Sequence, residues 1–156
     1  MALPPFQTAI EEHRDAVSRF LAATMGPQEA EDALQETLIA ALRAYPRLRP
    51  GSNLRAWFLT IARNKALDSF RARSRRPVPV PEPDAGSVDG PAADGEADPE
   101  LWAAVRALPP KQRAAVVLRF VNDLSHREIA RVLDSSEAAA RRSLHEGLSK
   151  LREEWA

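Results

Sequence analysis

A basic segment that also carries aromatic side chains is the first part of the sequence suited to a recognisable chemistry. Between Arg47 and Arg76 the chain holds nine Lys and Arg residues against one acid, Asp68. Cations at this density attract a phosphate backbone, and an aromatic ring can stack on an unpaired base. Trp57, Phe58 and Phe70 lie among these cations. We expect Phe58 and Phe70 to be core residues of a small bundle, whereas Trp57 suits the core and base stacking about equally.

A second group of cations lies near the C-terminus, in a pattern typical of a helix-turn-helix motif. Residues 125–152 read as a short helix, a tight turn and a second helix with a basic face. On that helix Arg141, Arg142 and His145 lie away from the leucine stripe. Arginine there can donate two hydrogen bonds to guanine or pair with phosphate. A solvated face of a structural helix explains the same charges, so both interpretations stay open.

Composition disfavours other kinds of site. The chain has no cysteine, which removes disulfides, thiolate metal ligands and cysteine nucleophiles. Its histidines, His13, His126 and His145, are far apart and lie in no metal-ligand spacing, so we expect them to be solvated or near helix caps. No nucleophile–base pair or phosphate-binding loop is recognisable. We therefore expect no metal, no cofactor and no enzymatic activity.

Three amphipathic helices must position the basic segment. Apolar spacing predicts them from about Phe6 to Met25, from about Gln28 to Tyr45, and from Asn53, a candidate N-cap, to the basic tail. Gly26-Pro27 stops the first helix and Pro46 ends the second. No strand alternation competes with this prediction. The residues predicted to face inward on the first two helices are Ile10, Val17, Phe20, Leu21, Ala30, Leu34, Leu38, Ala41 and Leu42.

Four shorter helices are predicted in the second half of the chain. Asp98-Pro99 starts one that Pro109-Pro110 separates from the next. Ser125 and Glu128 match a capping box before the third helix. A turn at residues 134–137 offers a second cap before the last helix, whose inward stripe is Ala140, Leu144, Leu148 and Leu151.

Charge is strongly segregated, although the formal net charge is zero. Residues 1–76 carry a net +4, residues 77–100 a net −7 and residues 101–156 a net +3. The acidic stretch is rich in proline and glycine and has almost no bulky apolar residue, so it cannot pack a core. We predict an all-α fold of two small helical domains, 1–76 and 99–156, joined by a flexible acidic linker at 77–98. The sequence leaves the relative placement of the domains open, because such a linker permits both a compact and an extended state.

Two sets of motifs resemble a single protein family. The first set resembles region two of an extracytoplasmic-function (ECF) sigma factor, a member of the sigma-70 family. It consists of the strings 30–37 (AEDALQET) and 54–64 (LRAWFLTIARN), together with Asp68 and the Arg71–Arg76 cluster. The second set resembles region four of the same family and consists of the strings 108–113 (LPPKQR), 118–120 (LRF) and 128–130 (EIA). Their order and the intervening linker agree over nearly the whole chain. The resemblance implies a sigma factor that binds core RNA polymerase and directs promoter-specific transcription initiation.

The resemblance also implies roles for particular residues. Asp32, Gln35 and Glu36 are expected to contact the beta-prime clamp helices of core polymerase. Region four is expected to bind the beta flap. The residues expected to read and melt the minus-ten element are Asn53, Arg55, Trp57, Asn64, Arg71 and Arg73. Reading of the minus-thirty-five element falls to Ser136, Arg141, Arg142 and His145. An anti-sigma factor is a further candidate partner.

Three positions depart from the family pattern. Ala139-Ala140 stands where Thr-Val is usual, Asp134 where the turn often has glycine, and Glu146 where a basic residue is common. The Glu146 carboxylate is expected to repel phosphate. These departures leave the fold prediction intact and bear on the sequence and strength of minus-thirty-five binding.

Rival functions make different predictions. A sigma-like mimic would titrate an anti-sigma factor without starting transcription, and a stand-alone helix-turn-helix repressor would bind free palindromic DNA tightly. An enzyme is the weakest rival. No apolar run approaches the roughly 20 residues of a membrane span, and the N-terminus lacks the pattern of a signal peptide. We therefore expect a cytoplasmic protein without membrane insertion.

Overall fold

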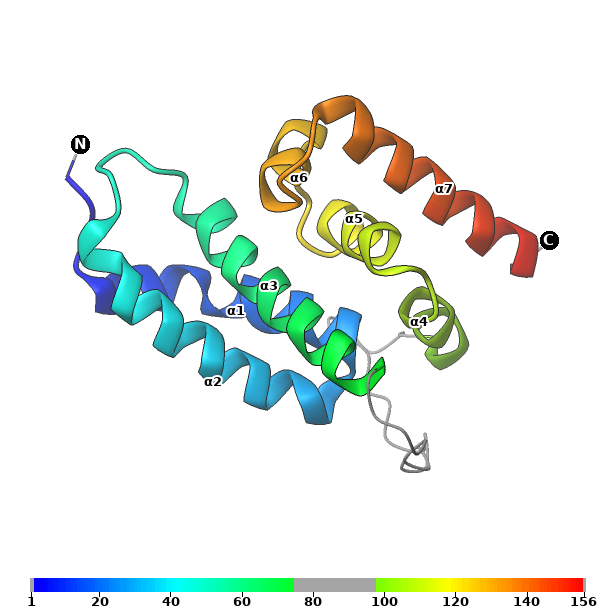
Figure 1. The fold of residues 1–156 in the computed structure, drawn as a ribbon, viewed down its shortest axis with the longest axis horizontal. Helices are drawn as coiled ribbons and strands as arrows, with labels where there is room; N and C mark the ends of the chain where they lie inside the picture. Colours follow the sequence, from blue (N-terminus) through cyan, green and yellow to red (C-terminus); the bar gives the residue numbers. More distant parts are fainter. Residues whose placement is uncertain (1, 75–97, 156) are drawn as a thin grey trace.

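The computed structural model describes residues 2–74 and 98–155, which we call the first and the second half. All regular elements in these residues are helical, which confirms the predicted all-α fold (Figure 1). The predicted linker falls outside the described residues except at Asp98, as do Arg75 and Arg76 of the basic cluster. No helix in the described part of the chain is both long enough and apolar enough to cross a bilayer.

The first half is a bundle of three long helices. These are α1 (Phe6–Met25), α2 (Pro27–Ala44) and α3 (Leu54–Ser74), with a short 3-10 helix, η1 (Tyr45–Arg47), after α2. Gly26 alone connects α1 to α2 and has a φ of +89°, a conformation that favours glycine. The side chain of Asn53 accepts a hydrogen bond from the Ala56 N–H at 3.1 Å and so caps α3. The three predicted helices are confirmed, with bounds shifted by one or two residues.

The core of the bundle holds large side chains from α1 and α3. Phe20, Leu21, Phe58 and Leu59 are at most 1% exposed, so the prediction of Phe58 as a core residue is confirmed. The prediction that Leu42 faces inward is wrong, since its side chain is 56% exposed. Leu42 lies on the outer side of α2, where no other helix of the described residues covers it.

The second half consists of four shorter helices. These are α4 (Pro99–Arg106), α5 (Pro110–Phe120), α6 (His126–Val132) and α7 (Glu137–Trp155). Ser125 and Glu128 form the predicted capping box at the start of α6. Between α6 and α7, Asp134 adopts a φ of +52°, which aspartate tolerates better than most residues. The turn therefore forms without the glycine that is frequent there in the family that the sequence resembles.

Helix α7 packs closely along α5. Ala140 and Leu144 of the predicted stripe are buried, and Leu148 and Leu151 are partly buried against the core. Gly147 allows the close approach, because a Cβ atom at this position would lie 2.9 Å from Cγ2 of Val116. The helix-turn-helix thus rests on α5 as a rigid support.

The two halves contact each other in one compact molecule. Helix α3 lies against α6, and α1 lies against α4 and α5, while α7 is on the far side of the second half (Figure 1). The prediction that Phe70 is a core residue is wrong, because its side chain is 38% exposed. It lies at the boundary between the halves, where the Arg113 guanidinium is 5.2 Å from its ring centroid.

Candidate nucleic-acid interface

The N-terminal part of α7 presents the predicted duplex-reading residues together. Ser136 is the N-cap, since its hydroxyl accepts a hydrogen bond from the Ala139 N–H at 3.0 Å. Arg141, Arg142 and His145 are exposed, as is Ser136. Arg141, Arg142 and His145 lie within about one helical turn of one another and away from the buried Ala140 and Leu144. This face offers cations beside a helix N-terminus, a combination that attracts phosphate.

Helix α6 and its flanking loops hold this face in position. Leu124, Ile129 and Val132 are fully buried and anchor α6 to the rest of the second half. The Arg119 guanidinium donates a hydrogen bond to the Leu124 carbonyl oxygen at 3.0 Å, which ties the loop before α6 to α5. The arrangement is a short positioning helix, a tight turn and an exposed second helix, as a helix-turn-helix requires.

Two acids modify the charge of the α7 face. Glu137 accepts a hydrogen bond from the Arg141 guanidinium at 2.9 Å, one helical turn away, in an exposed ion pair. Glu146 accepts a hydrogen bond from the Gln112 side chain of α5 at 3.2 Å. The unexpected Glu146 therefore has a structural partner on the neighbouring helix.

The loop before α3 forms a defined turn. Gly51 has a φ of +83°, and the Ser52 hydroxyl donates a hydrogen bond to the Arg49 carbonyl oxygen at 2.6 Å. The turn places Asn53 at the start of α3, where its side-chain oxygen caps the helix and its amide nitrogen faces the second half. Asn53 therefore has both a structural and a potential binding role.

Trp57 combines a core position with partial exposure. Its ring lies 5.1 Å from the ring of Phe58 in an edge-on contact and 5.9 Å from the ring of Tyr45. The side chain packs against the core but is only partly buried. Trp57 therefore packs against the core and keeps part of its surface exposed, and its role in base stacking stays a prediction.

The prediction that His13 is solvated or near a helix cap is wrong, because it lies in the interior of α1. Its ring packs 5.6 Å from the Phe58 ring, and its side chain is 18% exposed. Burial lowers the pKa of His13 below its ordinary value, opposed by the neighbouring Glu12 carboxylate. His13 is thus part of the support behind α3 rather than a free surface cation.

The six predicted minus-ten residues are spread along α3 rather than gathered in one cluster. Trp57, Asn64 and Arg71 are spaced by seven residues and therefore share one face of the helix. Arg73 lies at the C-terminal end of α3 and pairs with Glu29 of α2 at 3.0 Å. Asn53 and Arg55 lie at the opposite end. A helix of 21 residues is about 30 Å long, so these residues can follow a strand but cannot bind one nucleotide together.

Asn53 and Arg55 both reach the second half of the chain. The Arg55 guanidinium donates a hydrogen bond to Oε2 of Glu128 at 2.9 Å, and the Asn53 amide donates to the same oxygen at 3.5 Å. The hydrogen bond from Arg55 is the largest cause that lowers the pKa of Glu128 from 4.5 to about 2. This carboxylate is therefore ionised at neutral pH.

Two further residues that sequence reasoning missed join the halves. Arg113 of α5 donates hydrogen bonds to the Leu108 carbonyl oxygen at 3.0 Å and to the Thr24 carbonyl oxygen of α1 at 3.2 Å. Asn122, only 8% exposed, donates to the Ala16 carbonyl oxygen of α1 at 3.0 Å. Their partners are 89 and 106 residues away, so local patterns carried no signal of either contact.

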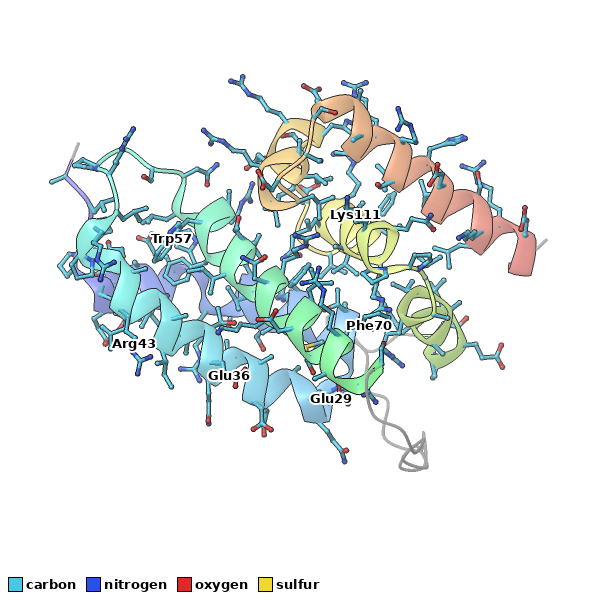
Figure 2. All side chains as sticks on the ribbon, viewed as in Figure 1. Glu29, Glu36, Arg43, Trp57, Phe70 and Lys111 are labelled. Atoms are coloured by element: carbon cyan, nitrogen blue, oxygen red, sulfur yellow. The ribbon has the colours of Figure 1, made fainter. Side chains whose placement is uncertain are left out.

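The outer side of α2 carries the predicted polymerase-contact residues. Asp32, Gln35 and Glu36 are all exposed there. Ile39 and Leu42, exposed by 50% and 56%, lie further along the same helix. Figure 2 shows Glu36 and Arg43 on the side of α2 away from the second half, whereas Phe70 projects from α3 toward it. Apolar spacing predicted Leu42 to face the core and gave no sign that Ile39 is exposed, so the apolar part of this surface was not predicted.

Comparison with known proteins identifies the family. The family model for sigma-70 region 2 matches residues 9–76, and that for sigma-70 region 4 matches residues 99–151. The chain is 34% identical to the ECF RNA polymerase sigma factor SigE of Mycolicibacterium smegmatis, a match that covers 97% of this chain and 62% of SigE. It is 34% identical to the RNA polymerase sigma factor CarQ of Myxococcus xanthus, covering 95% of this chain and 87% of CarQ.

A third relative and two solved structures agree with this family. The ECF RNA polymerase sigma factor SigX of Bacillus subtilis is 31% identical over 90% of this chain and 77% of its own length. The fold is similar to that of the sigma factor RpoE in a complex with the anti-sigma factor NepR from Bartonella quintana, with a TM-score of 0.75, 23% identity and coverage of 95% of this chain and 94% of RpoE. It is also similar to CnrH in complex with the cytosolic domain of CnrY, with a TM-score of 0.69, 22% identity and coverage of 95% and 85%. The chain therefore belongs to the sigma-70 family of RNA polymerase sigma factors, within the extracytoplasmic-function group.

Proposed function

We propose that this chain binds core RNA polymerase and directs it to promoters, with residues 1–76 acting at the minus-ten element and residues 99–156 at the minus-thirty-five element. Family membership supports the general role, and the match of separate family models to residues 9–76 and 99–151 supports the division. The observation that carries the proposal is the exposed face of α7, where Arg141, Arg142 and His145 lie beside the Ser136 cap.

Duplex reading by α7 follows from this geometry. A helix entering the major groove presents its N-terminal residues to base edges. Arg142 and His145 are exposed, while Arg141 must exchange the Glu137 carboxylate for phosphate or guanine. This exchange costs little, because an exposed ion pair within one helix contributes only about 0.3–0.5 kcal/mol.

Strand binding along α3 follows from the shared face of Trp57, Asn64 and Arg71. The partly exposed Trp57 ring offers a stacking surface for an unpaired base, backed by Phe58 and Tyr45. Stacking on an aromatic side chain contributes about 1–3 kcal/mol per base, comparable to the cost of unstacking a base from the duplex. Asn64 and Arg71 further along α3 are placed to contact the following nucleotides.

Polymerase binding is assigned to the outer side of α2. Asp32, Gln35 and Glu36 supply exposed polar and acidic groups, and Ile39 and Leu42 supply exposed apolar surface next to them. An apolar centre with a polar rim is the usual composition of a protein interface. A basic partner helix with apolar side chains, as expected for the beta-prime clamp, has the complementary chemistry; the beta flap is proposed as the partner of the second half.

The chain is proposed to act by binding rather than by catalysis, in the cytoplasm where polymerase works. An anti-sigma factor is a further candidate partner, since a sigma factor of similar fold has been solved with one. These assignments rest on the family and on the surfaces described above.

The test is transcription in vitro with sigma-free core polymerase on genomic fragments, with transcript ends mapped. Discrete starts that need the protein are expected. Arg142→Ala should reduce them about tenfold, since a good arginine contact to a base contributes about 1–3 kcal/mol. Arg152→Ala is the matched control, because Arg152 is an exposed arginine of α7 two to three turns further along.

Other outcomes would contradict the proposal in distinct ways. A protein that binds core polymerase or an anti-sigma factor but yields no start would be a sigma-like mimic. A protein that binds neither core polymerase nor an anti-sigma factor, but binds free palindromic duplex DNA tightly, would be a repressor.

A further inference from the structure

The contact of Asn53 and Arg55 with Glu128 places a carboxylate where the proposed function requires a phosphate. Both side chains donate to the same oxygen, Oε2, at 3.5 Å and 2.9 Å. Arginine binds carboxylate and phosphate through the same guanidinium donors, so the Arg55 nitrogen that donates to Glu128 is not available to a phosphate. The two residues at the start of α3 are therefore engaged by the second half of the chain itself.

Polar contacts elsewhere hold the halves in the same arrangement. Asn122 is 8% exposed and donates to the Ala16 carbonyl oxygen, while its own side-chain oxygen has no hydrogen-bond partner. Arg113 donates to the Thr24 carbonyl oxygen and covers the Phe70 ring. The contact between the halves thus has specific polar pairs, but it also buries a side-chain oxygen without a hydrogen-bond partner. Such an unsatisfied group weakens the contact, which suits an arrangement that must be able to open.

The closed arrangement cannot serve both promoter elements at once. The two elements are centred about 25 base pairs apart, or roughly 85 Å at 3.4 Å per base pair. In the structure α3 and α6 are in direct contact, and α7, which follows α6 after a short turn, is only about 28 Å long. The halves must separate for α3 and α7 to bind their elements together.

The two carboxylate oxygens of Glu128 accept hydrogen bonds from different groups. Oε1 accepts the Ser125 N–H at 3.2 Å and completes the α6 capping box, while Oε2 faces Arg55 and Asn53. Glutamine can replace glutamate in a capping box, because its side-chain oxygen also accepts a hydrogen bond. Glu128→Gln therefore weakens the contact between the halves and leaves the cap of α6 in place.

We propose that Glu128 is an internal competitor of DNA phosphate: in the free chain it occupies Asn53 and Arg55 and helps to hold the two halves closed. The proposal rests on the proposed function, because it assigns Asn53 and Arg55 to promoter DNA. In the closed chain the α7 face stays exposed, while Asn53 and Arg55 at the start of α3 donate to Glu128. Inhibition therefore acts on strand binding by the first half and not on duplex reading by the second.

The experiment measures closure and strand binding in the full chain without polymerase. The sequence has no cysteine, so Arg14→Cys on α1 and Lys150→Cys on α7, both exposed positions, accept a donor and an acceptor dye. Energy transfer reports closure, and a separate titration measures affinity for a short single-stranded DNA of mixed sequence. Glu128→Gln is expected to lower energy transfer at low salt and to strengthen DNA binding about fivefold, equivalent to about 1 kcal/mol.

Two matched variants separate competition from other effects. Ser125→Ala removes the cap of α6 but leaves Glu128 on Arg55, so it should change neither closure nor DNA affinity. Glu153→Gln removes one exposed acid near the C-terminal end of α7. It should strengthen DNA binding much less than Glu128→Gln. Equal gains from Glu153→Gln and Glu128→Gln would overturn the proposal, as would unchanged energy transfer in Glu128→Gln.

Failure of this inference is distinct from failure of the proposed function. The closure and strand-binding measurements need no polymerase, whereas the sigma activity is measured by transcription starts with core polymerase. If wild-type protein starts transcription but Glu128→Gln neither opens nor binds DNA more tightly, the competitor assignment alone is wrong. If no start is found, the proposed function fails whatever the energy transfer shows.

Discussion

The ion pair between Arg55 and Glu128 makes a quantitative prediction about stability and pH. A pKa lowered from 4.5 to about 2 corresponds to about 3 kcal/mol at about 1.4 kcal/mol per pKa unit, if solvent did not screen the pair. The side chains of Arg55 and Glu128 are 39% and 25% exposed, so screening reduces the expected coupling to about 1 kcal/mol. This is about two to three times the value expected for the more exposed pair of Glu137 and Arg141 within α7.

The dependence on pH follows from the direction of the pKa shift. The folded chain holds Glu128 as the carboxylate more strongly than the unfolded chain does, since its pKa falls from 4.5 to about 2 on folding. The stabilisation is therefore fully present above about pH 5 and is lost as pH falls toward 2.

The assay is a double-mutant cycle with Glu128→Gln and Arg55→Gln. Urea unfolding followed by far-UV circular dichroism gives the free energy of unfolding of the four proteins at neutral and at acidic pH. A coupling of about 1 kcal/mol at neutral pH that decreases as pH falls toward 2 is expected. The same cycle with Glu137→Gln and Arg141→Gln is the control and should give at most about 0.5 kcal/mol. A coupling between Arg55 and Glu128 that is zero at neutral pH, or that persists unchanged in acid, would refute the reasoning.

Three further predictions concern single features of the fold. Ser125→Ala, which removes the N-cap of α6, should lower the free energy of unfolding by about 1 kcal/mol in urea titrations; an unchanged midpoint would show that the cap contributes nothing. Phe58→Ala should cost about 3–5 kcal/mol because the ring is 1% exposed. Phe120→Ala should cost less than about 0.5 kcal/mol because that ring is 63% exposed, and equal losses of Tm in the two variants would contradict the described core. Leu42→Asp should change stability by less than about 0.5 kcal/mol but weaken binding to core polymerase, as measured by co-elution or fluorescence titration; undiminished binding would exclude Leu42 from the polymerase contact.

Local sequence signals predicted the helices well, because each boundary depends on residues close in the chain. Proline and glycine separate α1 from α2, Asn53 caps α3, and the Ser125–Glu128 capping box starts α6. The same signals placed the turn at Asp134 and the exposed basic face of α7. Such features need no knowledge of distant contacts, since capping and helical spacing act within four residues.

Side-chain burial was predicted less reliably. Apolar spacing assigned Leu42 and Phe70 to the core, yet they are 56% and 38% exposed, while His13 packs against Phe58 instead of facing solvent. Periodicity shows which residues share a helix face, but it does not show where a neighbouring helix ends. Leu42 lies on a face of α2 that no helix of the described residues covers, and Phe70 lies where the second half covers α3 only in part.

By itself, the sequence determined the helical class, the helix boundaries and the family, since these depend on local capping, periodicity and motif order. Only the tertiary structure decided how the two halves meet. Arg55 and Glu128 are separated by 73 residues, and Asn122 and Ala16 by 106. No local pattern pairs them, because their contact depends on the packing of α1 and α3 against α5 and α6. That packing brings the Glu128 carboxylate onto the Arg55 guanidinium, so a residue whose sequence pattern predicts only a helix cap also neutralises a cation expected to bind DNA.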